Sequence, residues 1–479
     1  MKRITLYIVI YILIFSTFSI LRHLSSMYGD PDLGLLNQSF YTTAFCGKIF
    51  FNTFEGASHF CRHNSPIYFI LLPFYILAPS LITLIILQTA AIAAGAIPVY
   101  LMARSRMGES AGNTFAILYL LYHPLHGVNY DPFHDLSFAI APLLSAVYFY
   151  VVKRNFRICW LFLLLALMAK EDVSFTVSFF GLYLIYDGIV SARSGIITPQ
   201  QRQMNILHGA LMVCTGFFYL LLSIYVIIPH FNPPYDSYNY FSERYGYFGK
   251  NIVEVIQSIL FHPFRTLRYL LVWPKVSFFL ETLAPLAFLS LLDLPLFLVA
   301  TPTYAIDLLS GFSAMHNSGS RYPSLLIPFI FASAIMGLSK LLEKKNEEER
   351  PFIYRKIIIY PIVLTILSTL LLNPSPFRIG WQFIPRVSEH QKTVLRLLRE
   401  IPPQASLSTQ VNIYQHASYR LNCYAWYCEG TEYIMLDPGN EWYDRIEPGW
   451  STTIQKLLRE GKYELIRECD KVQIYKKRS

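Results

Sequence analysis

Long apolar runs follow one another along most of the chain, with short polar segments between them. The first run, residues 4–21, begins just after Lys2 and Arg3. A helix needs roughly 20 apolar residues to cross the hydrocarbon of a bilayer, and this run comes close to that length. Further runs of similar character lie at residues 81–102, 114–125, 136–152, 158–169, 173–190, 206–228, 276–290, 295–309, 324–338 and 357–372. The pattern predicts a mainly α, polytopic transmembrane protein with about eleven spans.

One apolar stretch is interpreted differently. Residues 65–80 are interrupted by Pro66, Pro73 and Pro79. Because proline removes a backbone hydrogen bond inside a helix, we expect this stretch to lie at the interface or to re-enter the membrane. The first run lacks the small-residue cleavage site that follows a secretory signal, so it is interpreted as a span.

Basic residues between the runs predict the orientation of the helices, since loops rich in Lys and Arg tend to stay in the cytosol. With a cytosolic N-terminus, alternation places every strongly basic loop on the cytosolic side. These loops hold Arg104 and Arg106, Lys153 to Arg157, Arg193 and Arg202, and residues 340–356. We therefore expect a multi-pass protein of the cell membrane.

The character of the chain changes after the last apolar run. A helix-period stretch, a Pro-Pro break and short β-prone runs follow, and residues 463–477 are interpreted as two strands joined at Asp470. The sequence therefore divides into a membrane domain at residues 1–373, whose first external loop covers 23–80, and a soluble α/β domain at 374–479. An odd number of spans places the second domain outside the cytoplasm.

Composition agrees with a membrane protein. Hydrophobic residues make up 54% of the 479 residues and charged residues 15%, which is too apolar for a soluble chain of this length. The net charge of +9 does not require nucleic acid, because basic residues at cytosolic span ends give the same total. Among the seven cysteines, Cys46 with Cys61 and Cys423 with Cys428 would pair only in an oxidising space. Free thiols are the other interpretation.

The same topology gathers the reactive side chains on the outer face. Asp30 and Asp32 follow the first span, where a helix start would also favour Asp. His59 and His63 have the i, i+4 spacing of two metal ligands, although interfacial histidines are often only hydrogen-bonded. Other outer residues are His123, His126, Asp131, His134, Asp135, His316 and Arg321.

Lys170, Glu171 and Asp172 stand between two apolar runs. Three consecutive charges at a membrane surface are expensive unless they are paired or functional. A tight outer turn would also keep them in water. The loop at residues 123–135 has the same two interpretations, a site or a wet turn containing proline.

Several segments together resemble a known family. The acidic motif "DLGLLNQ" follows the first span, and "HNSPIY", "PVYLMARSRMG", "PFHD", "KED" and "SRYPSLLIPF" come after it. Over roughly residues 1–340 this order resembles the prokaryotic membrane family called domain of unknown function 2079. That family is similar in layout to the GT-C glycosyltransferases, which include oligosaccharyltransferases, protein mannosyltransferases and lipid A aminoarabinose transferases.

The resemblance implies a GT-C-like integral membrane glycosyltransferase. Such an enzyme would take a sugar linked to polyprenyl phosphate at the outer face of the bilayer and transfer it to a glycan, a lipid or a protein. The family's acidic position matches Asp32, and Asp30 in the same "DPD" is the second candidate for a catalytic residue. A carboxylate there would act as a general base or would hold a divalent cation, and the metal requirement stays open.

The resemblance also implies a set of substrate-binding residues. Positive side chains should face the phosphate that leaves the donor, and the outer candidates are Lys170, Arg321, His63 and His134. The full expected set is Gln38, His63, His134, Asp135, Lys170, Glu171, Asp172, Arg321 and Tyr322.

A transporter or lipid flippase is the alternative function. Coupling residues in transporters lie near the bilayer midplane on broken helices. The candidates here are Asp187, Glu281, Asp293 and Asp307, and all four lie near the ends of expected spans. This placement favours chemistry at a surface over transport through the middle. A sensor that displays the C-terminal domain would leave the outer polar loops unexplained.

Overall fold

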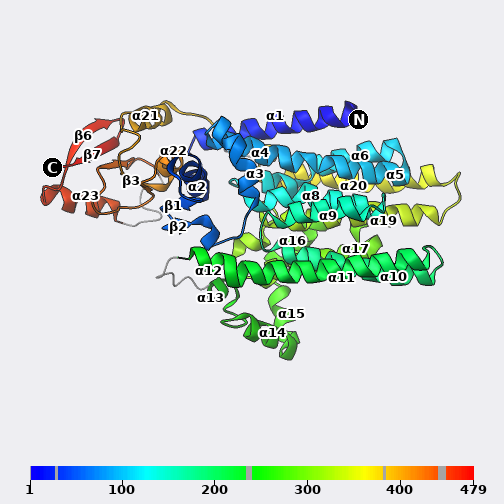
Figure 1. The fold of residues 1–479 in the computed structure, drawn as a ribbon. Helices are drawn as coiled ribbons and strands as arrows, with labels where there is room; N and C mark the ends of the chain where they lie inside the picture. The colour runs from blue at the N-terminus through cyan, green and yellow to red at the C-terminus, as the bar shows by residue number, and fades with distance from the viewer. Residues whose placement is uncertain (1, 27–30, 233–239, 381–384, 441–448, 479) are drawn as a thin grey trace.

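The structure, a computed structural model, contains a helical bundle with a smaller domain built on a β-sheet at one end (Figure 1). It describes residues 2–26, 31–232, 240–380, 385–440 and 449–478. Helix α1 (Lys2–Leu24) begins at the end of the bundle far from the sheet domain (Figure 1).

Seven helical segments among the described residues are long and apolar enough to span a bilayer. They are Lys2–Leu24 (α1), Leu81–Met107 (α4 and α5), Val173–Arg193 (α10), Pro199–Phe231 (α11 to α12), Leu289–Leu309 (ending in α18), Tyr322–Glu343 (ending in α19) and Arg350–Leu372 (α20). Four shorter apolar helices lie at Ile67–Leu77 (α3), Asp135–Val151 (ending in α8), Phe156–Leu167 (α9) and Ile252–Phe261 (α14). The mainly helical, polytopic fold predicted from the hydrophobic pattern is confirmed.

Short helices and 3-10 turns connect these segments. The short helices are α2 (Asp32–Cys46), α6 (Glu109–Leu121), α7 (His123–Tyr130), α13 (Tyr240–Tyr245), α15 (Pro263–Leu270), α16 (Trp273–Leu283), α17 (Leu294–Phe297) and α18 (Thr301–Leu309). The 3-10 turns used below are η1 (His59–Cys61), η2 (Asp135–Ala139), η5 (Leu289–Asp293), η7 (Ser313–His316) and η8 (Tyr322–Leu325).

The apolar run at residues 276–290 is not the single helix that its hydropathy predicts. Helix α16 ends at Leu283, and Pro285 lies in a short 3-10 turn. Ala287 and Phe288 then have φ of 51° and 58°, in the left-handed region that L-residues rarely adopt and that ends a helix. Neither residue is a glycine, so the sequence gives little warning of this break.

Helix α19 (Ile327–Glu343) is the central helix of the bundle. In its segment 89% of the apolar window is buried, against 28% for α1. It packs against η5, α5 (Ala96–Met107) and α8 (Ile140–Val151). A helix that is buried on all sides is held by neighbours in every direction. The turn η8 leads directly into α19 and is therefore held in place by a tightly packed helix.

Helices α10 and α11 (Pro199–Leu222) form a closely packed hairpin. A Cβ atom built on Gly181 would lie 2.5 Å from the backbone oxygen of Gly209, and one built on Gly209 would lie 2.6 Å from the oxygen of Gly181. Such distances are too short for any larger residue. Small residues at a helix contact allow this close backbone approach in membranes.

The C-terminal domain contains a five-stranded sheet with strand order β4-β3-β5-β7-β6. Its strands are β3 (Leu407–Thr409), β4 (Cys423–Tyr424), β5 (Tyr433–Leu436), β6 (Tyr463–Cys469) and β7 (Val472–Lys477), and its helices are α21 (Glu389–Leu398), α22 (Val411–Ala417) and α23 (Trp450–Arg459). Strand β3 runs parallel to β4 and β5, whereas β7 pairs antiparallel with β5 and β6. The two strands predicted within residues 463–477 are confirmed, with Asp470 in the turn between them.

This domain shares a hydrophobic core with helix α2 and the segment that follows it. Leu36 and Phe40 of α2 belong to the same buried cluster as Leu397 of α21 and Ile413 and Tyr414 of α22. This segment also contains a two-stranded hairpin of β1 (Phe51–Asn52) and β2 (Ala57–Ser58). The character of the sequence changes after residue 373, but residues on both sides of this boundary pack in one hydrophobic core.

Gln38 is the most heavily hydrogen-bonded side chain of this contact. It is fully buried, and its Nε2 donates to the carbonyl oxygens of Arg420 and Leu421 at 3.1 and 3.0 Å. Its Oε1 accepts from the backbone N–H of Thr53 at 2.9 Å and from the Tyr414 hydroxyl at 2.8 Å. One amide thus joins α2, the β1–β2 hairpin and the C-terminal domain.

Replacing Gln38 with Ala should destabilise the protein by about 2–4 kcal/mol, because it leaves several buried polar groups unsatisfied. The melting temperature of the purified protein should fall, and limited proteolysis should release the C-terminal domain sooner. The exposed Gln455 of α23 is the matched control, since its replacement with Ala should change stability by less than about 0.5 kcal/mol. Equal behaviour of the two variants would contradict the structural role of Gln38.

The orientation expected from the basic loops can be measured with reporter fusions. A reporter active only outside the cytosol should be inactive when fused at Gly108, between α5 and α6, or in the loop at residues 344–349. The same reporter should be active when fused after β7. Activity in the opposite pattern would place the C-terminal domain in the cytosol and reverse the expected topology.

Candidate active site

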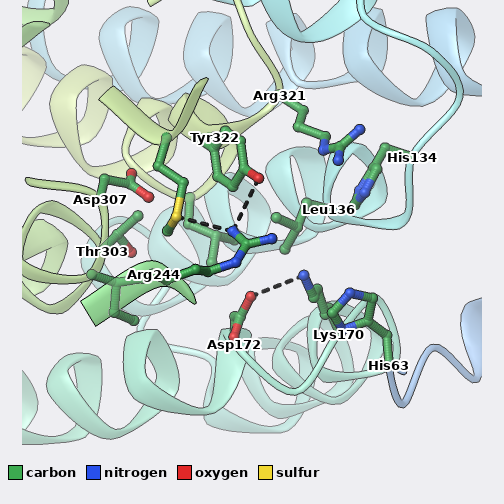
Figure 2. Close-up of a pocket in the computed structure, with 13 residues that line it drawn as sticks. His63, His134, Leu136, Lys170, Asp172, Arg244, Thr303, Asp307, Arg321 and Tyr322 are labelled. Atoms are coloured by element: carbon green, nitrogen blue, oxygen red, sulfur yellow. Dashed lines mark hydrogen bonds and ion pairs between the residues drawn. The ribbon is translucent and has the colours of Figure 1, made fainter. Parts of the chain in front are cut away.

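A cavity lies among the loops and helix ends of the bundle, and Figure 2 shows the side chains that line it. It encloses about 550 Å³, part of which is open to solvent. Six residues that the sequence assigned to substrate binding line this cavity: His63, His134, Lys170, Asp172, Arg321 and Tyr322. Segments more than 200 residues apart in the chain therefore converge on one site.

These side chains are brought together because they stand at the starts of helices. His134 precedes η2, Asp172 precedes α10 and Arg321 precedes η8, each at the N-cap position. None of the three side chains bonds to the N–H groups of the helix that it precedes, so each is left to face the cavity. Several apolar helices that start near one another therefore collect polar side chains at that end of the bundle.

Arg321 connects the cavity with the acidic residue that the family resemblance singled out. Its guanidinium lies 2.8 Å from the Oδ2 of Asp32, the first residue of α2. Its backbone N–H donates to Oδ2 of Asp131 at 2.8 Å. Asp32 does not line the cavity itself but borders it through this ion pair, and 30% of its side chain is exposed. Asp30, the second catalytic candidate, lies outside the described residues.

The charged triplet Lys170 to Asp172 lies between α9 and α10, and its side chains point in two directions. Lys170 is buried and faces the cavity, with its Nζ 3.2 Å from Oδ2 of Asp172. Glu171 turns away from the cavity and accepts from the backbone N–H of Asn64 at 2.8 Å. Its other oxygen lies 2.8 Å from Nδ1 of His63. The triplet is thus a paired element, and not a solvated turn.

Burial sets the protonation of the histidines that face the cavity. It lowers the pKa of His63 well below the ordinary value, and the positive charge of Lys170 acts in the same direction. Burial also lowers the pKa of His134, although the carboxylate of Asp135 opposes this shift. Burial raises the pKa of Glu171, against the attraction of Lys170. Both imidazoles are therefore neutral at pH 7 and face the cavity as hydrogen-bonding groups.

Asp135 contacts a residue that lines the cavity, His134, but does not line it. It is buried, and its Oδ2 accepts a hydrogen bond from the Ser65 hydroxyl at 2.6 Å. Its Oδ1 accepts from the backbone N–H of Leu136 at 2.7 Å and lies 2.6 Å from Nδ1 of His134. Asp135 therefore orients His134, a lining residue, and does not itself line the cavity.

Two charged residues of the cavity were not predicted as part of this site. Arg244 lies in α13, between α12 and α14, and donates to the Tyr322 hydroxyl at 3.3 Å and to the Met315 sulfur at 3.0 Å. Asp307 of α18 lines the same cavity (Figure 2), whereas the sequence had offered it only as a transport residue. Nothing in the sequence predicts that α13 reaches Met315 and Tyr322, so Arg244 could not be assigned to this site from the sequence.

Other expected residues lie elsewhere. Gln38 is buried in the contact with the C-terminal domain and does not line the cavity. His59 pairs with Glu55, its Nδ1 being 3.0 Å from Oε1. Among the residues that the structure describes, no group of three or more His, Cys, Asp and Glu side chains is placed to hold a metal ion. The structure therefore identifies no partner with which His59 and His63 would complete a metal site.

The remaining transport candidates have protein partners. Asp187 lies 3.2 Å from Arg154, and Asp293 lies 2.8 Å from Lys340. Glu281 accepts a hydrogen bond from the Ser318 hydroxyl. In the part of the chain that the structure describes, no disulfide joins Cys46 to Cys61 or Cys423 to Cys428.

The cavity combines three cations with two carboxylates. Lys170, Arg244 and Arg321 are arranged to bind an anion such as phosphate, since guanidinium and ammonium groups form short, charge-assisted hydrogen bonds with it. Asp172 and Asp307 supply acceptors for hydroxyl groups. The arrangement suits a ligand that carries both a phosphate and polar ring substituents.

Comparison with known proteins identifies relatives of this fold. A search of curated proteins finds no match. The crystal structure of ArnT from Cupriavidus metallidurans bound to undecaprenyl phosphate has a TM-score of 0.50 and 11% identity, with 97% of each chain covered. The apo state of the same protein has a TM-score of 0.51 and 10% identity, again over 97% of each chain. At this identity the likeness is evidence of fold alone, and it establishes the GT-C-like architecture.

The family is shown by the sequence itself. The model of a family described as "Predicted membrane protein (DUF2079)" matches residues 22–474. The match takes in helix α2, the bundle and nearly all of the C-terminal domain. Because it covers most of the chain, this protein belongs to the DUF2079 family of predicted membrane proteins.

Proposed function

We propose that this protein is an integral membrane glycosyltransferase that uses a sugar linked to polyprenyl phosphate at the outer face of the membrane. The observation that carries the proposal is the ion pair between Asp32 and Arg321. It places a candidate base beside a cation of a cavity that suits phosphate. The fold is consistent with this function, since the similar ArnT structure is described as bound to undecaprenyl phosphate.

Lys170, Arg244 and Arg321 bind the phosphate of the donor. In the transfer, the bond between the sugar's anomeric carbon and the phosphate oxygen breaks, and the electron pair stays on the phosphate. Cations held close to that oxygen stabilise the charge that develops on it. Lys170 suits this role because its burial strengthens its interaction with an anion.

Asp32 acts as the general base. The acceptor hydroxyl attacks the anomeric carbon and transfers its proton to the carboxylate, so a new glycosidic bond forms as polyprenyl phosphate leaves. Arg321 holds the carboxylate 2.8 Å away and so couples the position of the base to the position of the phosphate. Acceptor access is possible because the side chain of Asp32 is 30% exposed.

The membrane explains why this site lies at helix ends. A polyprenyl tail stays in the hydrocarbon, so the phosphate and sugar of the donor stand at the interface. Backbone and side-chain polar groups are tolerated there, whereas lipid-exposed polar groups at mid-depth are not. An external site agrees with the cytosolic side that is expected for the basic loops.

The reaction is tested in a deletion strain by profiling its lipids and glycans with mass spectrometry. Loss of a sugar modification, restored by the wild-type chain, supports the proposal. Unchanged glycans together with altered lipid or solute transport would overturn it in favour of the transporter alternative.

Asp32→Asn should accumulate normally but form product about 10²-fold more slowly, the scale expected for removing a general base. The loss of activity is measured by how far this variant restores the missing sugar modification in the deletion strain. Asp470→Asn is the matched control. Asp470 also forms an ion pair, with His390 at 2.7 Å, but lies in the C-terminal domain with 51% of its side chain exposed. Full activity of Asp32→Asn would reject the role of Asp32 as the base.

Arg244→Gln should weaken binding of undecaprenyl phosphate about tenfold or more, because a hydrogen bond to a charged group contributes about 1.5–3 kcal/mol. Binding is measured by calorimetry on the purified protein in nanodiscs. Arg265→Gln is the control, since Arg265 lies in the same loop region but is exposed and donates to the carbonyl oxygen of Tyr247. Equal affinity of both variants would remove Arg244 from the phosphate site.

A further inference from the structure

Asp307 is an unusual side chain within the cavity. It lies near the end of α18, is only 2% exposed and has an Oδ2 atom with no hydrogen-bond partner. The other four buried carboxyl groups in the described residues each have a partner: Asp135 with Ser65, Glu171 with Asn64, Asp293 with Lys340 and Asp437 with His390.

A buried carboxyl group without a partner is unfavourable for folding. The group loses its water and gains no hydrogen bond in return, whether or not it carries a proton. Unsatisfied polar groups in native structures therefore need an explanation. At Asp307 the cavity supplies one, because Figure 2 shows the carboxyl group among the side chains that line it.

The position of Asp307 within the cavity defines what would reach it. In Figure 2 Asp307 and Thr303 lie on one side of the cavity, and Arg321 and His134 lie on the opposite side, with Arg244 between them. A ligand with its phosphate at the cations would therefore direct its polar ring substituents toward Asp307.

We propose that Asp307 accepts a hydrogen bond from a hydroxyl or ammonium substituent on the sugar of the lipid-linked donor, and so determines which sugar is accepted. This inference rests on the proposed function and names the sugar-recognition end of its site. Thr303, one turn earlier on α18, supplies a hydroxyl group beside Asp307.

The test compares lipids that differ only in the sugar. The probes are undecaprenyl phosphate, undecaprenyl phosphate glucose, and undecaprenyl phosphate carrying a 4-amino-4-deoxy pentose, each titrated into the full-length protein in nanodiscs. The wild type should bind undecaprenyl phosphate and bind at least one sugar-bearing lipid more tightly. Asp307→Leu should lose about tenfold or more in affinity for that lipid and keep its affinity for undecaprenyl phosphate.

Asp307→Asn then identifies the substituent. Its amide oxygen still accepts from a hydroxyl, so the loss should be only a few-fold for a neutral sugar, whereas an ammonium group would lose a charged partner and bind much more weakly. Asp307→Leu should melt at or above the wild-type temperature in the absence of lipid, since it removes an unsatisfied polar group. Asp293→Asn is the control for a structural carboxylate and should melt lower, because it weakens the ion pair with Lys340.

Three results would overturn the inference. The first is an equal loss of affinity for bare and sugar-bearing lipid in Asp307→Leu, which would indicate general damage to the cavity. The second is a wild-type protein that binds undecaprenyl phosphate and the sugar-bearing lipids with equal affinity. This result would support the phosphate site but not sugar recognition. Failure of the wild type to bind any of the lipids would remove the proposed function together with the inference.

Discussion

The constraint on which this structure depends is that lipid offers no hydrogen bonds to a protein backbone. A chain that crosses the bilayer many times must do so as helices, and its polar side chains are confined to helix ends and loops. The bundle follows this rule, with His134, Asp172 and Arg321 at helix N-cap positions. The position of the candidate site at helix ends is therefore a consequence of how the fold satisfies its backbone.

The hydrophobic pattern predicted the fold class because each span carries its own signal. Length and apolarity are local properties, so the long segments and the β6–β7 pair were found from sequence. The break at Ala287 and Phe288 was missed, since an apolar run looks the same whether or not it turns. The shared core of α2 with α22 was missed for a different reason. It depends on which of several apolar surfaces meet, and no local pattern records that.

The candidate site was predictable to the extent that position in the sequence controls position in space. Lys170 and Arg321 were found because charges beside apolar runs must lie near the surface. Arg244 was not found, because its loop reaches the cavity only through tertiary packing. Gln38 entered the expected set through the family resemblance. Its partners Arg420 and Leu421 lie more than 380 residues further along the chain, and only the folded structure reveals them.

The same packing explains how a domain outside the bundle contributes to the site. Asp32 begins α2, and Gln38 lies six residues further along that helix, about 9 Å at 1.5 Å per residue. Gln38 is bonded to the C-terminal domain through Tyr414 and the carbonyl of Arg420. Asp32 is bonded to the bundle through Arg321. Helix α2 is therefore fixed at one point by the C-terminal domain and at another by the cavity, so the C-terminal domain positions the carboxylate without contacting the cavity itself.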